Sequence, residues 1–215
     1  MSATPSRGKF ISLEGGEGAG KSTLLAGLHE YIAQRGIKLV QTREPGGTSL
    51  GEAVRGIVLD PARSELAAET ELLLMFASRA QLVREVIEPA LSAGQWVLCD
   101  RFADASYAYQ GGGRGQPVER IAELERWACA GVKPDLTLLL DLPVATGRAR
   151  AAGRGDADRI EIETDAFFER VRTSYRERAA AEPDRFRVID ASQPALAVAQ
   201  AATIAIAELI GNSRP

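Results

Sequence analysis

The chain has 215 residues, of which 45% are hydrophobic and 26% charged, a composition that fits one α/β domain with a sizeable core. The formal net charge of −3 excludes an overall basic field of the kind that holds a nucleic-acid backbone, so we expect no nucleic-acid partner. No apolar stretch approaches the ~18 residues of a membrane span, and residues 1–9 lack the apolar segment of a secretion signal, so we expect no membrane association.

Five short runs of apolar or β-branched residues predict β-strands, and helical patterns fill the intervals between them. The strands are expected at 10–13, 38–42, 96–99, 136–140 and 186–189. The helices are expected at 21–35, 50–59, 67–95 with a break near Pro89, 117–130, 144–152, 165–182 and 195–210. Because strands alternate with helices, the pattern predicts βαβ units and a five-stranded parallel sheet that is covered by helices on both faces.

Two stretches rich in glycine and arginine interrupt this pattern, at 111–115 and 153–159, and we expect both to be mobile. The sequence contains no internal repeat, low-complexity tract or interdomain linker, so residues 1–215 are predicted to form a single domain. In sheets of this kind, ligands bind beyond the carboxyl ends of the strands.

The segment that follows the first predicted strand matches the phosphate-binding pattern G-x-x-x-x-G-K-[ST]. Gly15 and Gly20 frame the loop, and Lys21 and Ser22 open the next helix. Glycines let backbone N–H groups turn inward around an anion, the helix N-terminus adds its dipole, and the lysine reaches the outer phosphates. We therefore predict an α/β, P-loop NTPase-type doubly wound fold in which ATP is bound by Gly15, Gly16, Gly18, Ala19, Gly20, Lys21, Ser22 and Thr23.

Two aspartates at strand ends are candidates for holding the Mg²⁺ that accompanies the nucleotide. The Ser22 hydroxyl is placed to bind the metal. Asp100 and Asp141 each follow a predicted strand, and either carboxylate could approach the metal through water. We favour Asp100 because Arg101 converges on the same place, whereas Asp141 is equally compatible with a cap at the end of its strand.

Other classes of P-loop protein do not fit the sequence. A GTPase would need a base-specificity motif such as NKxD, which the sequence lacks. A motor or transporter ATPase would be larger and would carry a strand that ends in Asp-Glu, whereas the strand that ends at Asp100 continues into Arg101. The small size, two arginine-rich loops and the carboxylate of Glu17 inside the glycine loop favour a kinase that acts on a small phosphorylated acceptor.

Four motifs, taken together and in order, resemble the thymidylate kinase family. They are the glycine loop 15–22, TREPGGT at 42–48, DRF at 100–102 continuing to AYQGGGR at 108–114, and DRIE at 158–161. The resemblance implies transfer of the γ-phosphoryl group of ATP to dTMP, giving dTDP and ADP in the synthesis of dTTP, with Mg²⁺ as the cofactor. It also implies a homodimer, to which amphipathic helices around 72–86 could supply an apolar face.

The resemblance assigns several residues to the phosphate and sugar of dTMP. Glu17 matches the acidic residue that accepts a hydrogen bond from the 3′-hydroxyl. Arg101 matches the guanidinium that clamps the monophosphate, and Arg43 resembles a further acceptor-side arginine. Tyr109 matches the ring that leaves no room for a ribose 2′-hydroxyl, and Gln110 follows it in the same motif.

Three further residues are implied to contact the thymine base. Arg79 resembles the arginine that reads the edge of the base, and Ser106 falls where a polar side chain contacts it, although the family often has its serine one position earlier. Phe76 is the nearest aromatic residue that could stack on the base. Here the chain departs from the family, because the stacking phenylalanine usually lies four residues before the arginine, where this chain has Met75.

The transition state of phosphoryl transfer needs a cation near the γ-phosphoryl group. Some family members keep an arginine in the glycine loop, where this chain has Gly18. The stretch 148–159 holds four arginines and resembles the lid of the bacterial type of the family, at about 148–160. By this resemblance Arg154 is the catalytic arginine, Arg150 stacks on adenine and Arg159 supports the phosphates, so the catalytic set is Lys21, Arg154, Arg101 and Glu17.

Alternative interpretations of the sequence stay open at this point. Another nucleoside monophosphate kinase, acting on UMP, CMP or GMP, is opposed by the pair Glu17 and Tyr109. A deoxynucleoside kinase would leave Arg101 without an acceptor phosphate, and a non-catalytic nucleotide-binding module would not need an intact set of catalytic residues. Cys99 and Cys129 show no metal-ligand spacing and are expected to be reduced thiols of a cytoplasmic protein.

Overall fold

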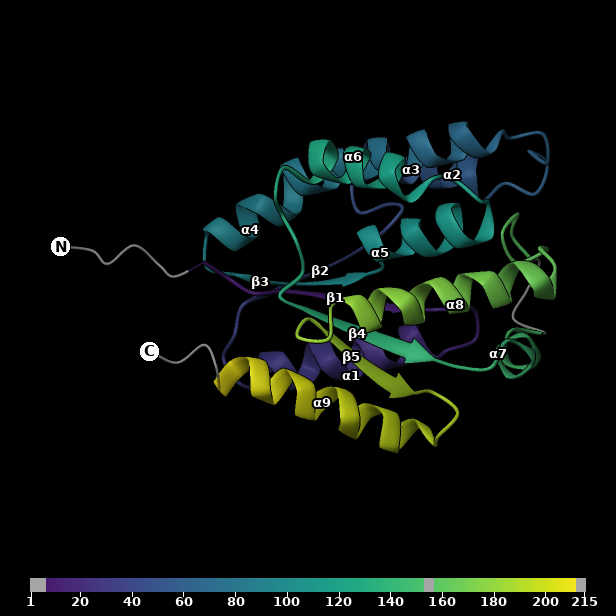
Figure 1. Ribbon diagram of the computed structural model, residues 1–215. Helices are drawn as coiled ribbons and strands as arrows, with labels where there is room; N and C mark the ends of the chain where they lie inside the picture. Colours follow the sequence, from purple (N-terminus) through teal and green to yellow (C-terminus); the bar gives the residue numbers. More distant parts are fainter. Residues whose placement is uncertain (1–6, 153–156, 212–215) are drawn as a thin grey trace.

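Five parallel strands form one sheet in the order β2-β3-β1-β4-β5. The computed structural model describes residues 7–152 and 157–211 of the chain (Figure 1). The predicted α/β fold is confirmed, and each predicted strand is present with bounds that differ by one or two residues. The strands are β1 (Phe10–Gly15), β2 (Leu39–Arg43), β3 (Trp96–Asp100), β4 (Leu136–Asp141) and β5 (Phe186–Asp190).

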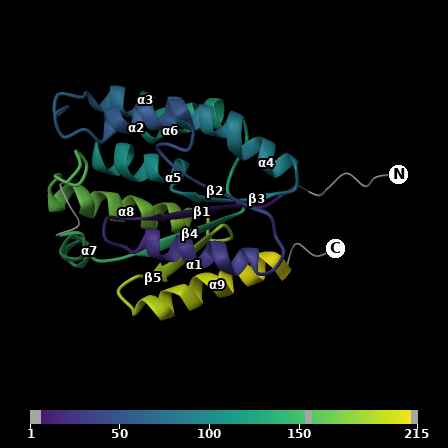
Figure 2. The same ribbon diagram turned by 180° about the vertical axis from the view of Figure 1, so that it is seen from behind.

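Helices cover both faces of this sheet (Figures 1 and 2). Helices α1 and α9 lie on one face, α4, α5 and α8 lie on the other, and α2, α3 and α6 form an outer layer. The α-helices are α1 (Lys21–Ala33), α2 (Ser49–Val58), α3 (Ala68–Leu82), α4 (Glu88–Ser92), α5 (Ala103–Ser106), α6 (Val118–Cys129), α7 (Val144–Ala151), α8 (Asp165–Ala181) and α9 (Ala195–Gly211), and the π-helical segments are η1 (Val83–Ile87) and η2 (Tyr107–Gly113).

The core is built on strands that are buried on both faces. Along β1, Ile11 and Leu13 pack toward α1 and α9, whereas Phe10 packs on the opposite side against Phe102. All of these side chains have no exposed surface. Continuous burial of this kind is expected for a central parallel strand, and it leaves only the loops at the strand ends free to bind ligands.

The chain stays helical where a break was expected near Pro89. The π-helical turn η1 leads directly into α4, which has Pro89 in its first turn. Proline cannot donate a backbone hydrogen bond, and its ring crowds the carbonyl one turn earlier, so a wider turn before it accommodates the ring without ending the helix.

The expectation of a mobile loop at 111–115 is wrong for its first three residues. Gly111–Gly113 belong to η2 and pack against α8. A Cβ atom at Gly112 would lie 2.8 Å from the carbonyl oxygen of Arg170, and one at Gly113 would lie 2.4 Å from the ring of Phe167. These glycines allow close packing of two helices rather than flexibility.

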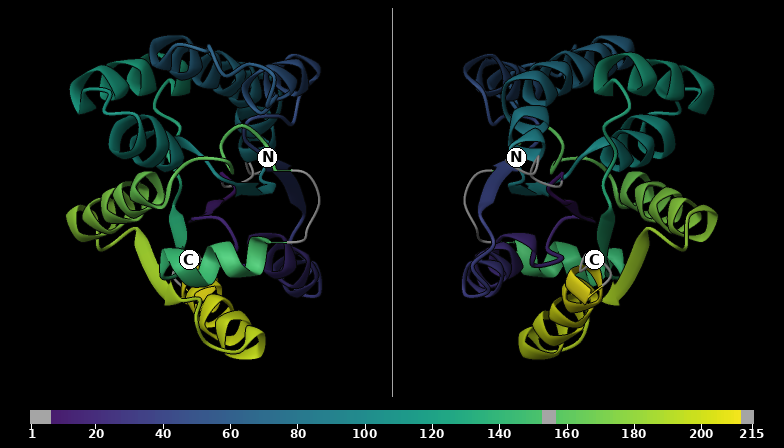
Figure 3. Two further views of the ribbon diagram at one scale, coloured as in Figure 1. Left: turned by 90° about the vertical axis from the view of Figure 1, so that its right-hand side faces the viewer. Right: turned by 90° about the vertical axis from the view of Figure 1, so that its left-hand side faces the viewer.

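Helix α7 lies across the carboxyl end of the sheet, as the end-on view in Figure 3 shows. It therefore borders the edge at which every motif of the sequence is found. Within residues 7–152 and 157–211, no helix is long and apolar enough to cross a membrane. Cys99 and Cys129 are both buried free thiols.

Candidate active site

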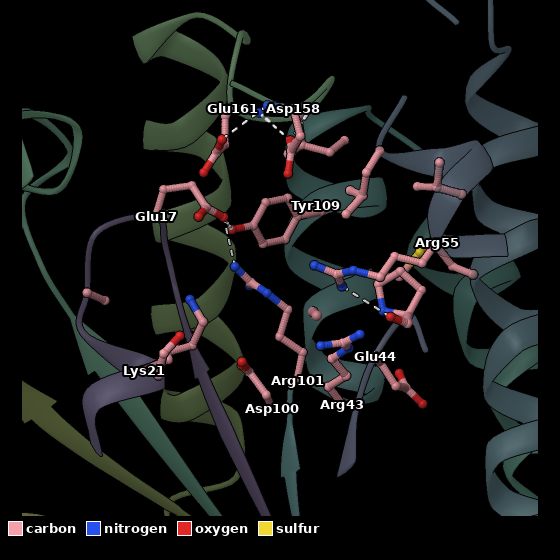
Figure 4. Close-up of a pocket in the computed structure, with 18 of the residues that line it drawn as sticks. Glu17, Lys21, Arg43, Glu44, Arg55, Asp100, Arg101, Tyr109, Asp158 and Glu161 are labelled. Carbon is pink, nitrogen blue, oxygen red and sulfur yellow. Dashed lines mark hydrogen bonds and ion pairs between the residues drawn. The ribbon is translucent and has the colours of Figure 1, made fainter. Parts of the chain in front are cut away.

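Strand register brings the main motifs together at the carboxyl edge of the sheet. Leu13 of β1 is paired with Asp100 of β3, and Gly15 is paired with Leu140 of β4. Arg43 of β2 is likewise paired with Asp100, so the loops that follow β1, β2 and β3 are neighbours, and they border a cavity of ≈ 380 Å³ (Figure 4). Its lining comprises 17–23, 43–45, Arg55, Val58, Leu59, Met75, Asp100, Arg101, Ala105, Tyr109, Gln110, Asp158, Ile160 and Glu161.

The glycine loop has the backbone shape that an anion site requires. Gly15, Gly18 and Gly20 all have positive φ angles, of 141°, 70° and 92°. Helix α1 starts at Lys21 without any side chain capping its first N–H groups, so these donors are available to a ligand. The ammonium group of Lys21 instead donates to the carbonyl oxygens of Gly15 and Gly16, both at 3.0 Å. Burial lowers the pKa of Lys21 to about 8.

A contact between two glycines joins this loop to α7. A Cβ atom at Gly18 would lie 2.0 Å from the carbonyl oxygen of Gly147, and one at Gly147 would lie 2.3 Å from that of Glu17. Any side chain at position 18 would therefore displace α7. This contact gives the physical reason why the glycine loop carries no arginine at that position.

The predicted lid is described only in part. Arg154 lies outside the described residues. Arg150, at the end of α7, donates to the carbonyl oxygen of Ala191 at 2.7 Å, which places it beside the loop that follows β5. Arg148 forms an ion pair with Asp165 at 2.9 Å.

Arg101 links the glycine loop to the end of β3 (Figure 4). Its Nη2 atom donates to Oε1 of Glu17 at 2.8 Å, and its Nη1 atom donates to the carbonyl oxygen of Gly15 at 3.0 Å. The hydroxyl of Tyr109 donates to the same Glu17 oxygen at 3.1 Å, and the guanidinium lies 4.7 Å from the centre of the tyrosine ring. The structure thus brings Glu17, Arg101 and Tyr109 together in one corner of the cavity.

The backbone of Arg101 is held in an unusual conformation. Its φ angle is 69°, in the left-handed region that non-glycine residues rarely adopt. Such conformations persist only where the surroundings enforce them, and they concentrate at functional sites. The N–H of Arg101 donates to the carbonyl oxygen of Leu13 at 3.0 Å, which ties the turn to β1.

Glu14 of β1 stabilises this turn through hydrogen bonds, although no sequence motif marked it as a site residue. Its Oε1 atom accepts from the N–H of Phe102 and its Oε2 atom accepts from the hydroxyl of Tyr175, both at 2.7 Å. The Tyr175 hydroxyl also accepts from Arg101 at 3.2 Å. Burial, followed by the charge of Asp104, raises the pKa of Glu14 to about 8. The only signal in the sequence was a carboxylate directly before Gly15, at a strand position that is usually apolar.

Asp100 is the carboxylate that fits a metal ion. It lines the cavity beside Ser22, and its Oδ1 atom is buried without a hydrogen-bond partner among the described residues. Asp141 is already engaged, because Arg172 donates to both of its carboxylate oxygens at 2.7 and 3.0 Å. Across residues 7–152 and 157–211, no group of three or more His, Cys, Asp or Glu residues could hold a metal, so water and phosphate oxygens would complete the coordination, as is usual for Mg²⁺.

Met75 rather than Phe76 lines the cavity. Phe76 is 3% exposed and packs in the core with Leu72, Tyr107 and Ile121. Successive helix residues point about 100° apart, so only one of the two can face the cavity. The expectation that Phe76 stacks on a base therefore does not agree with the structure, in which Phe76 packs in the core.

Arg79 and Ser106 lie behind the cavity lining. The guanidinium of Arg79 is fully buried, and its Nε atom donates to Oε2 of Glu44 at 2.8 Å. Its Nη1 atom donates to the hydroxyl of Ser106 at 3.0 Å. Ala105, one position before Ser106, is the residue that lines the cavity.

Two arginines lie where the motifs did not place them. Arg55 of α2 lines the cavity and donates to the carbonyl oxygen of Pro45 at 3.1 Å, although no motif marked it. The only sequence signal for Arg55 was its positive charge in the helix that follows the TREPGGT motif. Arg159 was expected beside the phosphates. It is instead buried and bound to Glu71, so that expectation is wrong. Arg43 lines the cavity and pairs with Glu52 at 2.9 Å.

Comparison with known proteins adds independent information. A family model described as thymidylate kinase matches residues 13–202. The chain is 56% identical over 205 residues to the thymidylate kinase of Alkalilimnicola ehrlichii, an alignment that covers 95% of this chain and 94% of that protein. It is 52% identical over 207 residues to the thymidylate kinase of Pseudomonas fluorescens, covering 96% of this chain and 99% of that protein. These matches span nearly the whole chain and include the glycine loop, β3 and the turn at 158–161.

Proposed function

The chain belongs to the thymidylate kinase family, and on this premise we propose how its own residues carry out the reaction. The enzyme transfers the γ-phosphoryl group of ATP to dTMP, giving dTDP and ADP. The observation that carries the proposal is the position of Arg101, between the glycine loop and Tyr109 in one cavity. The whole chain is proposed to act as one kinase domain with a lid at about 148–160.

The glycine loop is proposed to hold the ATP phosphates. Positive φ angles at Gly15, Gly18 and Gly20 turn the loop N–H groups toward an anion, and the uncapped start of α1 adds further donors. Bound phosphates would attract the Lys21 ammonium group away from the loop carbonyls and raise its pKa from about 8, since they supply the negative charge that the buried amine lacks.

The acceptor phosphate and sugar are proposed to bind around Arg101. A guanidinium fork matches phosphate geometry, and Arg43 and Arg55 line the same cavity. Glu17 would exchange part of its contact with Arg101 for the 3′-hydroxyl of the sugar. The Tyr109 ring, fixed by its hydrogen bond to Glu17, would then stand against the 2′ position and disfavour a ribose.

The base is proposed to lie between Met75 and Gln110. Met75 offers a flexible apolar surface where the family usually has an aromatic ring. The Oε1 atom of Gln110 is buried without a hydrogen-bond partner among the described residues, so it is available to accept from a base. Arg79 and Ser106, immediately behind this wall, are proposed to act at the edge of the base.

Mg²⁺ is proposed to be held by Ser22 and Asp100 together with the nucleotide phosphates. When bound, the ion neutralises charge on the β- and γ-phosphates. The unpartnered Oδ1 atom of Asp100 supports this assignment. Arg101, Lys21 and the lid arginines orient the two substrates in line and exclude water.

The remaining cation for the transition state is proposed to be Arg154, and Arg150 is proposed to contact adenine. The close contact of Gly18 with Gly147 supports a lid origin for the arginine, because it leaves no room for a side chain in the loop. Among the nucleotide-binding loop residues, only Lys21 carries a positive charge.

We also propose a homodimer and a cytoplasmic location. Leu73 of α3 and Trp127 of α6 are 57% and 84% exposed, and both helices belong to the outer layer, so this layer is the proposed dimer face. Both substrates are nucleotides of the cytoplasmic pool, where Cys99 and Cys129 would stay reduced.

A coupled assay of ADP release across a panel of nucleoside monophosphates tests the proposed function. We expect dTMP to give the highest kcat/KM, with UMP far below it because of Tyr109. Equal use of UMP and dTMP would overturn the proposed acceptor site, and absence of ADP release with ATP, Mg²⁺ and dTMP would overturn catalysis itself.

A further inference from the structure

Glu71 is a buried carboxylate that does not line the cavity but binds three residues from two segments around it. It lies on α3 with no exposed surface. Its Oε1 atom accepts from Nε2 of Gln110 at 2.9 Å, and its Oε2 atom accepts from Arg159. The Nε atom of Arg114, which follows η2, donates to Oε2 of Glu71 at 3.2 Å.

The contact with Glu71 determines the orientation of the Gln110 amide. A carboxylate placed between two guanidinium groups only accepts hydrogen bonds, so the NH₂ end of the amide must face it. The C=O end must then face away from Glu71. Its oxygen is buried without a partner among the described residues, and Gln110 lines the cavity. A hydrogen-bond acceptor of fixed orientation, without a partner among the described residues, therefore lies in a side chain that borders the cavity.

The same carboxylate also holds the 158–161 turn, which forms another part of the cavity wall. Arg159, bound to Glu71, also donates through Nε to the carbonyl oxygen of Val58 at 2.7 Å, and its N–H donates to that of Leu59 at 3.0 Å. Its chain neighbours Asp158 and Ile160 both line the cavity. Movement of Glu71 would thus disturb the Gln110 amide and the 158–161 turn together.

We propose that Glu71 is a positioning residue for acceptor specificity, which holds the carbonyl end of Gln110 toward the base and anchors the 158–161 turn to the same point. This proposal rests on the proposed function, in which the base lies beside Gln110. Thymine and uracil carry an N3–H donor, whereas N3 of cytosine is an acceptor. A carbonyl that is fixed in place therefore accepts from thymine and repels cytosine, because a buried acceptor left facing another acceptor is unfavourable.

The substitution Glu71→Gln tests this chemistry directly. The new side chain has the same shape, but its NH₂ group can donate to Gln110, so the Gln110 amide can turn and present its own NH₂ to the base. We expect the ratio of kcat/KM for dTMP to that for dCMP to fall by about tenfold or more, mainly through a higher KM for dTMP. The value for dUMP should fall with that for dTMP, since both bases share the N3–H edge. An unchanged dTMP to dCMP ratio in the folded variant would overturn the proposal.

Two further variants separate specificity from stability. Glu163→Gln removes the other carboxylate that binds Arg114 without touching Gln110, so the substrate ratio should stay at the wild-type value. Gln110→Met keeps Glu71 and its arginines but removes the amide, so discrimination against dCMP should weaken even if Glu71→Gln does not fold. If Gln110→Met keeps the wild-type ratio, the amide does not read the base and the proposal is wrong. Absence of dTMP kinase activity in the wild-type enzyme would instead refute the proposed function.

Discussion

The Nη2 atom of Arg101 lies 2.8 Å from the Oε1 atom of Glu17, and this ion pair joins the end of β3 to the phosphate loop. Both side chains are largely removed from solvent, with 16% and 24% of their surfaces exposed. Each therefore has its charge compensated before a substrate arrives. We therefore expect an acceptor phosphate at Arg101 and a sugar hydroxyl at Glu17 to favour each other, because each would replace part of the contact that the other weakens.

The first prediction is that Arg101→Ala weakens binding of the acceptor more than of ATP. Removing one partner of a largely buried charge pair costs roughly 2–5 kcal/mol, so the KM for dTMP should rise by about 30-fold or more. Steady-state kinetics with dTMP and ATP varied separately measure the effect. Arg84→Ala is the matched control, since its side chain is 75% exposed and should change neither KM.

The second prediction concerns pH and Glu14. Because its pKa is raised from 4.5 to about 8, the native protein keeps a proton that the unfolded chain releases between these values. The free energy of unfolding should therefore decrease as the pH rises from about 5 to 8, by an amount on the order of a few kcal/mol. Glu14→Gln carries no titratable group and should flatten this slope. Urea unfolding at several pH values measures it, and the exposed Glu119→Gln should keep the wild-type slope.

The third prediction tests the metal assignment. Asp100→Asn should raise the Mg²⁺ concentration needed for half-maximal activity by about tenfold or more at saturating ATP, since a carboxylate that binds metal or its water contributes on this scale. Asp141→Asn removes a carboxylate that Arg172 already binds, so it should lower stability and leave the Mg²⁺ requirement unchanged. The reverse pattern would move the metal to the end of β4.

Much of this site could be predicted from the sequence because its motifs are local. The glycine loop, Asp100 and Arg101 lie at strand ends, and parallel pairing of β1 with β3 necessarily brings them together. Contacts between distant segments could not be predicted in this way. Arg159 looked like a phosphate ligand in its basic loop, yet Glu71, 88 positions earlier, binds it in the interior.

The side of a helix on which each residue lies also decides details of the site that the motifs leave open. A shift of one residue exchanges Met75 and Phe76 between the cavity and the core. The spacing to Arg79 favoured position 75 and the residue type favoured Phe76, and the structure follows the spacing. The glycines of η2 present a similar ambiguity, since glycine allows both mobile loops and close helix packing. Only the position of α8 distinguishes these two roles.

The fourth prediction is that Arg154→Ala lowers kcat by ~10²–10³ with a modest change in the KM for dTMP, the effect of losing one preorganised transition-state donor. Single-turnover kinetics with saturating ATP separate this loss from product release. Arg148→Ala lies on the same segment but pairs with Asp165, so a much smaller effect is expected. An unchanged kcat in Arg154→Ala would refute the lid assignment.

The fifth prediction concerns the contact between Gly18 and Gly147. Gly18→Ala forces a Cβ atom toward the Gly147 carbonyl oxygen at 2.0 Å, and the φ angle of 70° adds backbone strain. Because that atom is backbone, α7 and the phosphate loop must move apart, and kcat/KM for ATP should fall by about 100-fold. Gly27→Ala is the matched control: it lies inside α1 with nothing within 4 Å, so the same methyl group should raise stability by roughly 0.5–1 kcal/mol and leave kinetics unchanged. If Gly18→Ala keeps full activity, the loop and α7 separate freely, and the absence of an arginine at this position needs another cause.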